Sequence, residues 1–472
     1  MEGAALTSLP PRLMRYLLPL ALAVAVTACD SDPVGPTDDV RTFRVEITNV
    51  APAFGVLKSG VFNTPVGGAM PGPIFPGDAY AFSFTAPGNV TPGSGMNLSL
   101  ATMFIQSNDL FYTFEAGGLP LFDADGDPRT GDVTSEILLY DAGTEVNMEP
   151  GVGMDQAPRQ AGPDTGADEN GVLGRIDAGV ADRAGFTYPE AGDVIRVTLA
   201  HDGDSEFTVR IENVSTASTL AASDGTHPVP LSPGGWAVHT DAVDFFTSGE
   251  AAPDWVEDIA EDGDPSTFAA TFGPMSGVTV PLSPGALAVH TDAVDFFESG
   301  TAASAGLEAI AEDGSPGTIV AALMGLAGVR SVTAFDTPTG ASGPGPIGPG
   351  GSYVVEVEAA PGDRLSFATM FVQSNDLFYT FEGDGLALFS GTTPVSGDVT
   401  SDVFLYDAGT EVNQEPGVGD EQVIRQGSAD AGTDEGGVLG RIDDGAPGRG
   451  GFTYPDVADV IRVTVTPVNQ RR

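Results

Sequence analysis

Cations are scarce in this 472-residue sequence, which has 19 Lys and Arg against 66 Asp and Glu and a formal net charge of −47. Neutralising the phosphates of a nucleic acid requires clustered Lys and Arg. The composition therefore excludes a protein that binds a nucleic-acid backbone. The sequence also has a single cysteine, which excludes an internal disulfide framework.

Signatures of enzymes are also missing. The sequence contains no GxSxG elbow, HExxH motif or GxxxxGKS phosphate loop. His239 and His290 occupy the same position of a duplicated segment, and no second His or Cys stands at metal-ligand spacing. Because paired Asp and Glu residues can hydrolyse glycosides, a secreted hydrolase acting on envelope polysaccharide stays open as the alternative function.

The abundant residues indicate a turn-rich β protein. The chain has 63 Gly and 37 Pro, yet 41% of its residues are hydrophobic and 26 are Phe, which is too much core material for a disordered chain. Short β-rich runs are separated by Gly, Pro and Asp turns, a spacing that favours antiparallel sandwiches. The predicted fold class is all-β, with two tandem antiparallel β-sandwich domains.

The N-terminal segment resembles that of a bacterial lipoprotein. An apolar run at 16–26 is too short to span a bilayer but suits a signal-peptide core, and it ends in VTAC, which resembles a lipobox. The resemblance implies a signal peptide at 1–28, a lipid-anchored tether at 29–41 and lipid attachment at Cys29. The mature chain would then contact the lipid bilayer through acylated Cys29 and face the periplasm or the exterior. The alternative is an ordinary cleaved signal.

Internal repeats predict the domain organisation. SLATMFIQSNDLFYTF at 99–114 recurs as SFATMFVQSNDLFYTF at 366–381, and LYDAGTEVN and FTYP also occur twice in the same order. Each copy is preceded by a strand of alternating apolar and polar residues, FRVEITNV at 43–50 and FTVRIENV at 207–214. We therefore expect domain 1 at 43–204 and domain 2 at 205–467.

A further repeat lies inside the second copy. PLSPGGWAVHTDAVDFF at 230–246 returns as PLSPGALAVHTDAVDFF at 281–297, in a 51-residue segment that is repeated at about 228–327. Each segment contains a short strand and then a helix that ends in AEDG, where Gly263 and Gly314 suit the left-handed residue that closes a helix. On this division, domain 1 lacks the helical segment and domain 2 carries it twice.

The repeats also place carboxylates in the same contexts twice. Asp109 follows a strongly apolar strand, and Asp141 and Glu145 bracket a tight Ala-Gly-Thr turn that can point both carboxylates towards one place. Oxygen ligands gathered from loops are what Ca²⁺ prefers. Alternatively, Asp and Asn favour such turns for backbone hydrogen bonding alone. The acidic loops 162–171 and 428–437 are either solvated or contribute to the metal site.

The repeated motifs together resemble the spondin N-terminal domain family, which includes F-spondin and mindin. The matching pieces are SGTAASAGLEAIAEDGSP, LSFATMFVQSNDLF, DVFLYDAGTEVN and FTYP. The resemblance implies an antiparallel β-sandwich with calcium among the loops at one edge and a role in adhesion. Carried over position by position, the implied metal ligands are Asp109, Asp141 and Glu145 in the first copy and Asp376, Asp407 and Glu411 in the second.

The departures from that family limit what it implies. Leu110 and Leu377 replace a Trp, Glu145 and Glu411 replace an Asp, and the disulfides of animal members are absent. The expected function is that of a non-enzymatic, lipid-anchored envelope protein with calcium-binding adhesion or surface-binding modules. Its expected ligand is an extracellular or envelope polysaccharide or protein.

Overall fold

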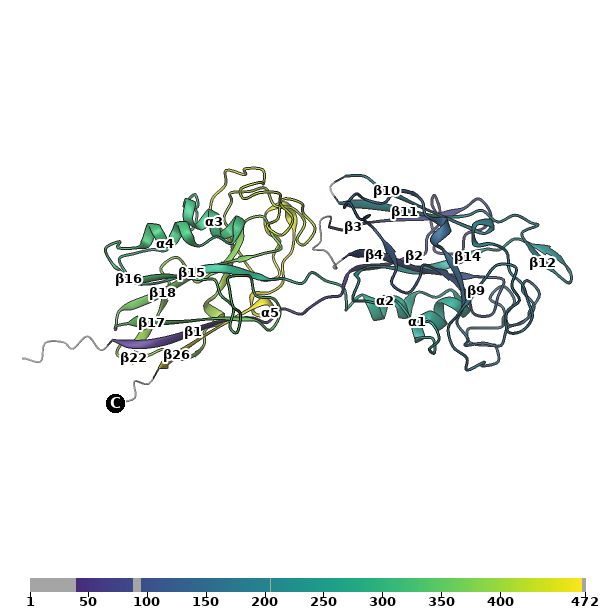
Figure 1. Cartoon of the computed structure of the whole chain (residues 1–472), viewed down its shortest axis with the longest axis horizontal. Coiled ribbons are helices and arrows are strands. Elements are labelled where there is room, and N and C mark those ends of the chain that lie inside the picture. The colour runs from purple at the N-terminus through teal and green to yellow at the C-terminus, as the bar shows by residue number, and fades with distance from the viewer. Residues whose placement is uncertain (1–39, 88–94, 204, 469–472) are drawn as a thin grey trace, which may run out of the picture. The chain divides into compact units, whose positions relative to one another are not determined.

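The computed structural model of the chain describes residues 40–87, 95–203 and 205–468. Most of its regular structure is antiparallel strand, and its helices are few and short (Figure 1). The predicted all-β sandwich class is therefore confirmed. The predicted signal peptide, Cys29 and the tether up to residue 39 lie outside the described residues. Within the described part, no helix is long and apolar enough to cross a membrane.

Two sheets and a helical layer make up what we call the first sandwich. Its seven-stranded sheet contains, in order, β2 (Val56–Phe62), β14 (Leu231–Thr240), β4 (Met96–Phe104), β5 (Leu110–Thr113), β8 (Leu138–Asp141) and β9 (Gly174–Ile176), with β6 (Leu119–Pro120) paired to β4. Its four-stranded sheet contains β3 (Ala79–Thr85), β11 (Glu206–Asn213), β10 (Ile195–His201) and β7 (Gly131–Asp132). The helical layer is α1 (Asp254–Glu257), the π-helical turn η3 (Asp258–Asp262) and α2 (Ser266–Phe272), and the hairpin β12 (Leu220–Ala222) and β13 (Gly225–His227) is an addition.

The second sandwich repeats this arrangement. Its seven-stranded sheet contains β16 (Val329–Phe335), β15 (Leu282–Thr291), β18 (Asp363–Phe371), β19 (Leu377–Thr380), β24 (Phe404–Asp407) and β25 (Gly440–Ile442), with β20 (Leu386–Ala387) paired to β18. Its four-stranded sheet contains β17 (Ser352–Ala359), β1 (Arg41–Asn49), β26 (Ile461–Val468) and β23 (Gly397–Asp398). The helices are α3 (Ala305–Asp313), α4 (Gly317–Leu323) and α5 (Val457–Val460), and β21 (Phe389–Ser390) pairs with β22 (Thr393–Pro394). Short 3₁₀ turns in the two sandwiches are η1 (Thr134–Glu136), η2 (Ala191–Asp193), η4 (Thr400–Asp402) and η5 (Arg449–Gly451).

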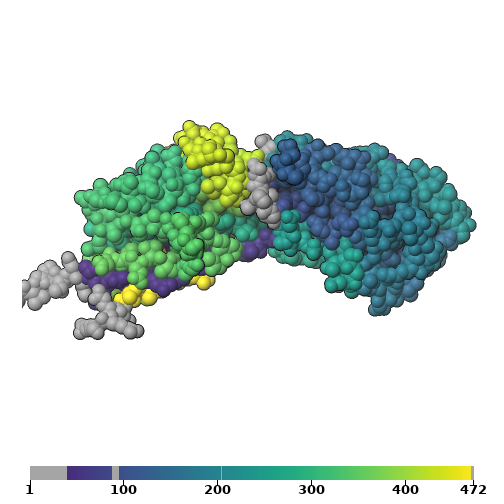
Figure 2. Space-filling view, in the orientation of Figure 1, coloured from purple at the N-terminus to yellow at the C-terminus, as the bar shows by residue number. Residues whose placement is uncertain are grey.

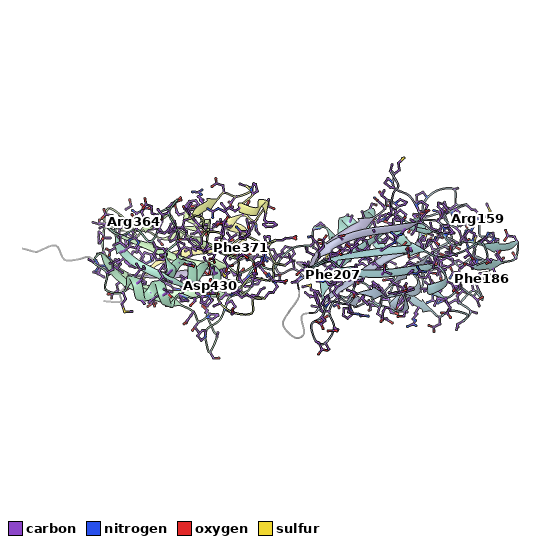
Figure 3. All side chains as sticks on the ribbon, turned by 90° about the horizontal axis from the view of Figure 1, so that it is seen from above. Arg159, Phe186, Phe207, Arg364, Phe371 and Asp430 are labelled. Atoms are coloured by element: carbon purple, nitrogen blue, oxygen red, sulfur yellow. The ribbon has the colours of Figure 1, made fainter. Side chains whose placement is uncertain are left out.

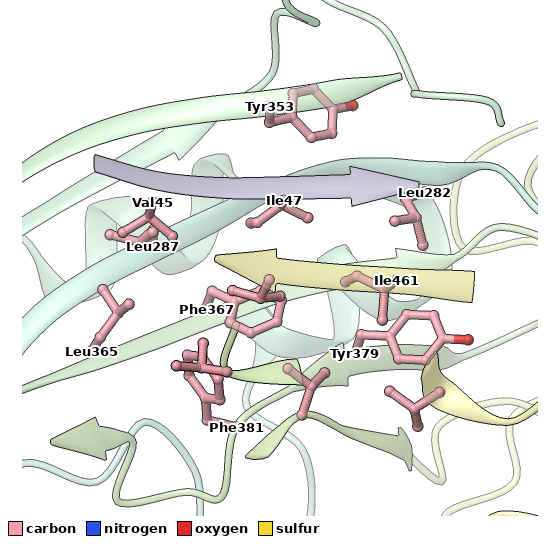
Figure 4. Close-up of a cluster of buried hydrophobic side chains, with 14 of the residues drawn as sticks. Val45, Ile47, Leu282, Leu287, Tyr353, Leu365, Phe367, Tyr379, Phe381 and Ile461 are labelled. Carbon is pink, nitrogen blue, oxygen red and sulfur yellow. The ribbon is translucent and has the colours of Figure 1, made fainter. Parts of the chain in front are cut away.

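The central strands are buried on both faces because each seven-stranded sheet lies between two apolar layers. In β4, Leu98 and Leu100 belong to the core between the two sheets, whereas Ala101 packs with the cluster beneath the helices. This explains why β4 is a nearly continuous apolar run, unlike β1, whose burial alternates with period two. Figure 4 shows the corresponding core of the second sandwich, in which Val45 and Ile47 of β1 pack among residues such as Phe367 and Tyr379.

The helical layer begins and ends at the residues that its sequence indicates. Ser304 precedes α3 and its side chain accepts a hydrogen bond from the Leu307 amide, and Gly314 closes the helix with a φ of 62°. Gly263 closes η3 in the same way with a φ of 64°, so the predicted left-handed glycines are confirmed. The buried side of α3 carries Leu307 and Ile310, which cover the outer face of the seven-stranded sheet.

The strand pairing corrects the expected division at residues 204 and 205. The strand at 43–50, expected to open domain 1, is β1, and it pairs with β17 and β26 of the second sandwich. The strand at 207–214, expected to open domain 2, is β11, and it pairs with β10 and β3 of the first sandwich. In Figure 2 the purple residues of β1 lie among the green and yellow residues of the second sandwich.

Loop length explains this exchange. Because β1 and β11 share the same alternation of apolar and polar residues, either strand would suit the place beside β10. Only residues 202–205 separate β10 from β11, so the two strands form a local hairpin, and closing a short loop loses little conformational entropy. The place beside β26 is then left for β1, whose partner is about 400 residues away in the sequence.

The prediction that one domain lacks the helical segment is also wrong. β14 from the first copy of the segment lies between β2 and β4, and the helices that follow it cover the same sheet. β15 from the second copy takes the equivalent place between β16 and β18. Without β14, the edges of β2 and β4 would be unpaired and Phe111 and Tyr140 would be uncovered, which explains why each sandwich requires one segment.

Candidate metal centre

Strand register brings Asp109 and Asp141 together at one end of the first sandwich. Asp109 immediately precedes β5, Asp141 is the last residue of β8, and Leu110 is directly opposite Asp141 in the ladder. The Ala142 amide donates to the Asp109 carbonyl at 3.0 Å, which continues the ladder by one residue. Both carboxylates are buried, since Asp109 is 0% and Asp141 4% exposed.

The acidic loop at 162–171 adds a third carboxylate. This loop runs antiparallel to the turn after β8, with hydrogen bonds from the Glu169 amide to the Thr144 carbonyl and from the Gly171 amide to the Gly143 carbonyl, both at 2.7 Å. One carboxylate oxygen each of Asp109, Asp141 and Glu169 lies within 4.8 Å of the other two. We call these three residues centre 1. Glu169 is the member that sequence reasoning did not name individually.

Asp109 has an oxygen without any partner, which is unusual for a buried carboxylate. Its Oδ2 accepts hydrogen bonds from the Thr144 amide at 2.8 Å and the Glu145 amide at 3.2 Å. Its Oδ1 is buried and accepts none. An unpaired buried charge is costly, so this oxygen is suited to a cation at centre 1.

The second sandwich has an equivalent centre 2, formed by Asp376, Asp407 and Glu435. One carboxylate oxygen each of these residues lies within 4.8 Å of the other two. Asp376 repeats the pattern of Asp109, because its Oδ2 accepts the Thr410 amide at 2.8 Å and the Glu411 amide at 3.2 Å while its Oδ1 is buried without a partner. The same orphaned oxygen therefore occurs in both copies.

Glu145 and Glu411 do not join these centres. Glu145 groups instead with Asp164 and Glu261, and Glu411 groups with Asp430 and Glu312; Asp430 is labelled in Figure 3. The expectation that both carboxylates of the Asp-Ala-Gly-Thr-Glu turn point to one place is thus wrong. Gly143 turns the chain with a φ of 70°, and the Glu145 carboxylate then accepts the Gly166 amide at 2.7 Å and the Asn108 side-chain amide at 3.2 Å.

Glu261 and Glu312 were also missed as members of an acidic group. They belong to the AEDG ends of η3 and α3, where the sequence predicts only a helix terminus. Their carboxyl groups are buried at 3% exposure and come close to Glu145 and Glu411 through tertiary packing of the helices. The only sequence signal for these glutamates was that AEDG occurs in both segments. Such a repeat does not tell whether the glutamate is a metal ligand or merely part of a helix terminus.

Burial raises the pKa of the buried carboxyl groups in these clusters. The pKa of Asp109 is raised well above its usual range by burial and then by the neighbouring charge of Asp141, and the same causes involving Asp407 raise the pKa of Asp376 to about 7. Burial raises the pKa of Glu261 and of Glu312 to about 8. These carboxyl groups resist ionisation unless a cation neutralises them.

The stability of the cation-free protein is expected to fall as pH rises from about 4.5 to about 8. In that window the folded chain keeps the protons of Glu261 and Glu312 that the unfolded chain releases, so raising the pH favours unfolding. At about 1.4 kcal/mol per pKa unit, we expect a loss on the order of 5 kcal/mol for each glutamate. The measurement is denaturant unfolding in a chelator across this pH range.

The matched control for this pH dependence is the double variant Glu261→Gln with Glu312→Gln. It removes the two groups whose pKa is raised to about 8 and is expected to reduce the slope of the profile between pH 4.5 and 8, to which Asp109 and Asp376 still contribute. A wild-type stability that increases with pH over the same window would contradict the assignment.

The Gln-Ser-Asn-Asp motif before β5 organises the loops around centre 1. Gln106 accepts hydrogen bonds from the Arg159 guanidinium at 3.3 Å, and the Ser107 hydroxyl donates to the Phe104 carbonyl at 2.6 Å. The Asn108 side-chain oxygen accepts the Met148 amide at 3.0 Å. Three of the four motif residues thus hold the backbone that carries Asp109 and the loop opposite it.

The repeated histidines have a structural role. His239 is 0% exposed, and its Nδ1 lies 3.0 Å from the Thr240 carbonyl, to which it donates. Its Nε2 then accepts the Ser99 hydroxyl at 2.9 Å, and His290 repeats the contact with Ser366 at 2.8 Å. Each pair links neighbouring strands inside a seven-stranded sheet and does not reach the acidic centres.

Comparisons with known proteins add no assignment. No protein-family model matches the chain, and no curated protein matches its sequence.

Proposed function

We propose that this chain is a lipid-anchored envelope protein whose two sandwiches bind calcium and act as non-enzymatic adhesion or surface-binding modules. The observation that carries the calcium part is the buried, unpartnered Oδ1 of Asp109, repeated in Asp376. Calcium takes six to eight oxygen ligands at irregular geometry. Three carboxylates at each centre, with water or an external ligand completing the shell, suit that requirement.

The lipobox and the spondin-like motifs support the remainder of the proposal. Lipidation of Cys29 would hold the sandwiches at a membrane surface through the tether. A calcium ion with open coordination positions would bridge the acidic loops to carboxylate or hydroxyl oxygens of a polysaccharide or protein. This also explains how a chain with a net charge of −47 could bind anionic surface polymers.

The hydrolase alternative has one favourable observation. Glu145 and Glu261 form a close pair of carboxyl groups, of which Glu261 has a pKa of about 8, as a general acid requires. Both residues are at most 4% exposed, however, which leaves little room for a sugar between them. Binding without turnover is therefore the expected behaviour.

The test is retention of labelled envelope polysaccharides and surface proteins on immobilised residues 30–472. We expect retention in millimolar Ca²⁺, release by a chelator and no cleavage of the labelled glycans. Fragments cleaved from the labelled glycans would establish the hydrolase instead. Retention that is unchanged by the chelator would contradict a calcium-dependent module.

A further inference from the structure

Equivalent arginines meet the two metal centres differently. Within the described part of the chain, Arg183 pairs with one carboxylate of centre 1, that of Glu169, at 3.1 Å. Its counterpart Arg449 places one nitrogen, Nη1, 2.9 Å from both Asp407 Oδ1 and Glu435 Oε2. Two of the three carboxylates of centre 2 therefore already have a cationic partner.

The surroundings of Arg449 show that it lies further into its centre. A Cβ placed on Gly409, in the turn after Asp407, would be 2.3 Å from Arg449 Nη1. At the equivalent Gly143, the nearest atoms to such a Cβ are backbone atoms of Val172. The guanidinium of Arg449 thus lies closer to the turn after Asp407 than that of Arg183 lies to the turn after Asp141, although the charge of Arg183 also acts on Asp141.

Two substitutions next to the arginines accompany this difference. Gly450 follows Arg449 with a φ of 77°, a left-handed conformation that Ala184, which follows Arg183, does not adopt. Asp182 precedes Arg183 and accepts the Tyr188 hydroxyl at 2.8 Å, whereas Gly448 has no side chain. The backbone that leads into the arginine is consequently held in different conformations in the two copies.

We propose that Arg449 competes with the bound cation at centre 2, so that the two centres fill at different calcium concentrations and centre 1 fills first. This inference rests on the proposed calcium function. A calcium ion entering centre 2 must displace a guanidinium that makes two charge-assisted hydrogen bonds to its carboxylates. At centre 1, among the described residues, the guanidinium of Arg183 pairs with Glu169 alone. The chain would then respond to calcium in two steps.

Calorimetric titration of residues 30–472 with Ca²⁺ tests the inference. The variant Asp407→Asn isolates centre 1, and Asp141→Asn isolates centre 2. We expect the Kd of centre 2 to exceed that of centre 1 at least tenfold. Arg449→Gln should lower the Kd of centre 2 by about tenfold, while the matched Arg183→Gln should change the Kd of centre 1 less than threefold.

A second variant tests the same inference without removing the positive charge of Arg449. Gly448→Asp with Gly450→Ala gives these two positions the residues of the first sandwich, and it should also lower the Kd of centre 2 while Arg449 stays present. Equal Kd values for calcium at the two centres, or a Kd of centre 2 that Arg449→Gln does not change, would overturn this inference but leave the calcium function standing. Absence of heat at both centres would overturn the calcium function and this inference with it.

Discussion

A fragment of residues 53–279 is expected to fold by itself into the complete first sandwich. It contains both sheets, from β2 to β14, and the helices that cover the larger one, so the inter-sheet core and the helical core are both present. In contrast, the repeat-based fragment 43–204 lacks β11, β14 and the helices, and carries β1 without either partner. We expect it to stay unfolded or to aggregate, because it leaves long edges and apolar faces open.

Circular dichroism, dispersion of amide signals in NMR spectra and cooperative thermal unfolding measure the difference. The matched control is residues 43–272, which adds β11, β14 and the helices to the shorter fragment. It should restore cooperative unfolding, although β1 has no partner strand in it. If residues 43–204 unfold cooperatively and residues 53–279 do not, the strand exchange between the two sandwiches is wrong.

Replacing Asp109 and Asp376 by Asn is expected to abolish calcium binding and to stabilise the calcium-free protein. The Asn oxygen can keep the two backbone amides that now reach Oδ2, and its NH₂ group would stand where Oδ1 has no partner, next to the other two carboxylates. Removing each buried carboxyl group, whose ionisation is costly without a cation, should stabilise its sandwich by roughly 1–3 kcal/mol. Wild-type protein should instead gain about 2.7 kcal/mol per site at a calcium concentration of 100 times Kd, and the double variant nothing.

Thermal unfolding with and without calcium measures both effects, and the two sandwiches should be followed separately because they need not unfold together. Asp125→Asn is the matched control, since it removes one exposed carboxylate without touching either centre. It should leave the calcium response intact. A calcium-dependent rise in Tm that persists in the double Asn variant would remove these two residues from the ligand set.

The two candidate centres share the same core contacts although the residues around them differ. The orphaned aspartate oxygen, the amides that hold its other oxygen and the third carboxylate from the acidic loop occur in both copies. The arginine beside them does not keep the same contacts. The repeated contacts are therefore those on which the proposed calcium function depends, and the arginine contacts are those in which the two centres differ.

By itself the sequence determined the sandwich class, the main strands and the placement of Asp109 and Asp141 at strand ends, whereas only the family resemblance implied that these two aspartates converge. These follow from local patterns: the turn-rich composition, the apolar runs, and two aspartates at the ends of strands. Gly263 and Gly314 likewise closed their helices as predicted, because a left-handed helix end is a local property of glycine.

Only the tertiary structure decided which copies of the repeated pieces pack together and which carboxylates share a centre. β1 and β11 have the same pattern of apolar and polar residues, so no local signal tells which sandwich each completes. The short loop between β10 and β11 and the open place beside β26 decide it. The separation of Glu145 from Asp141 and its approach to Glu261 depend on a turn and on a helix more than 100 residues away. Contacts between distant segments are set by packing of the whole sheet, which residue patterns within one segment do not encode.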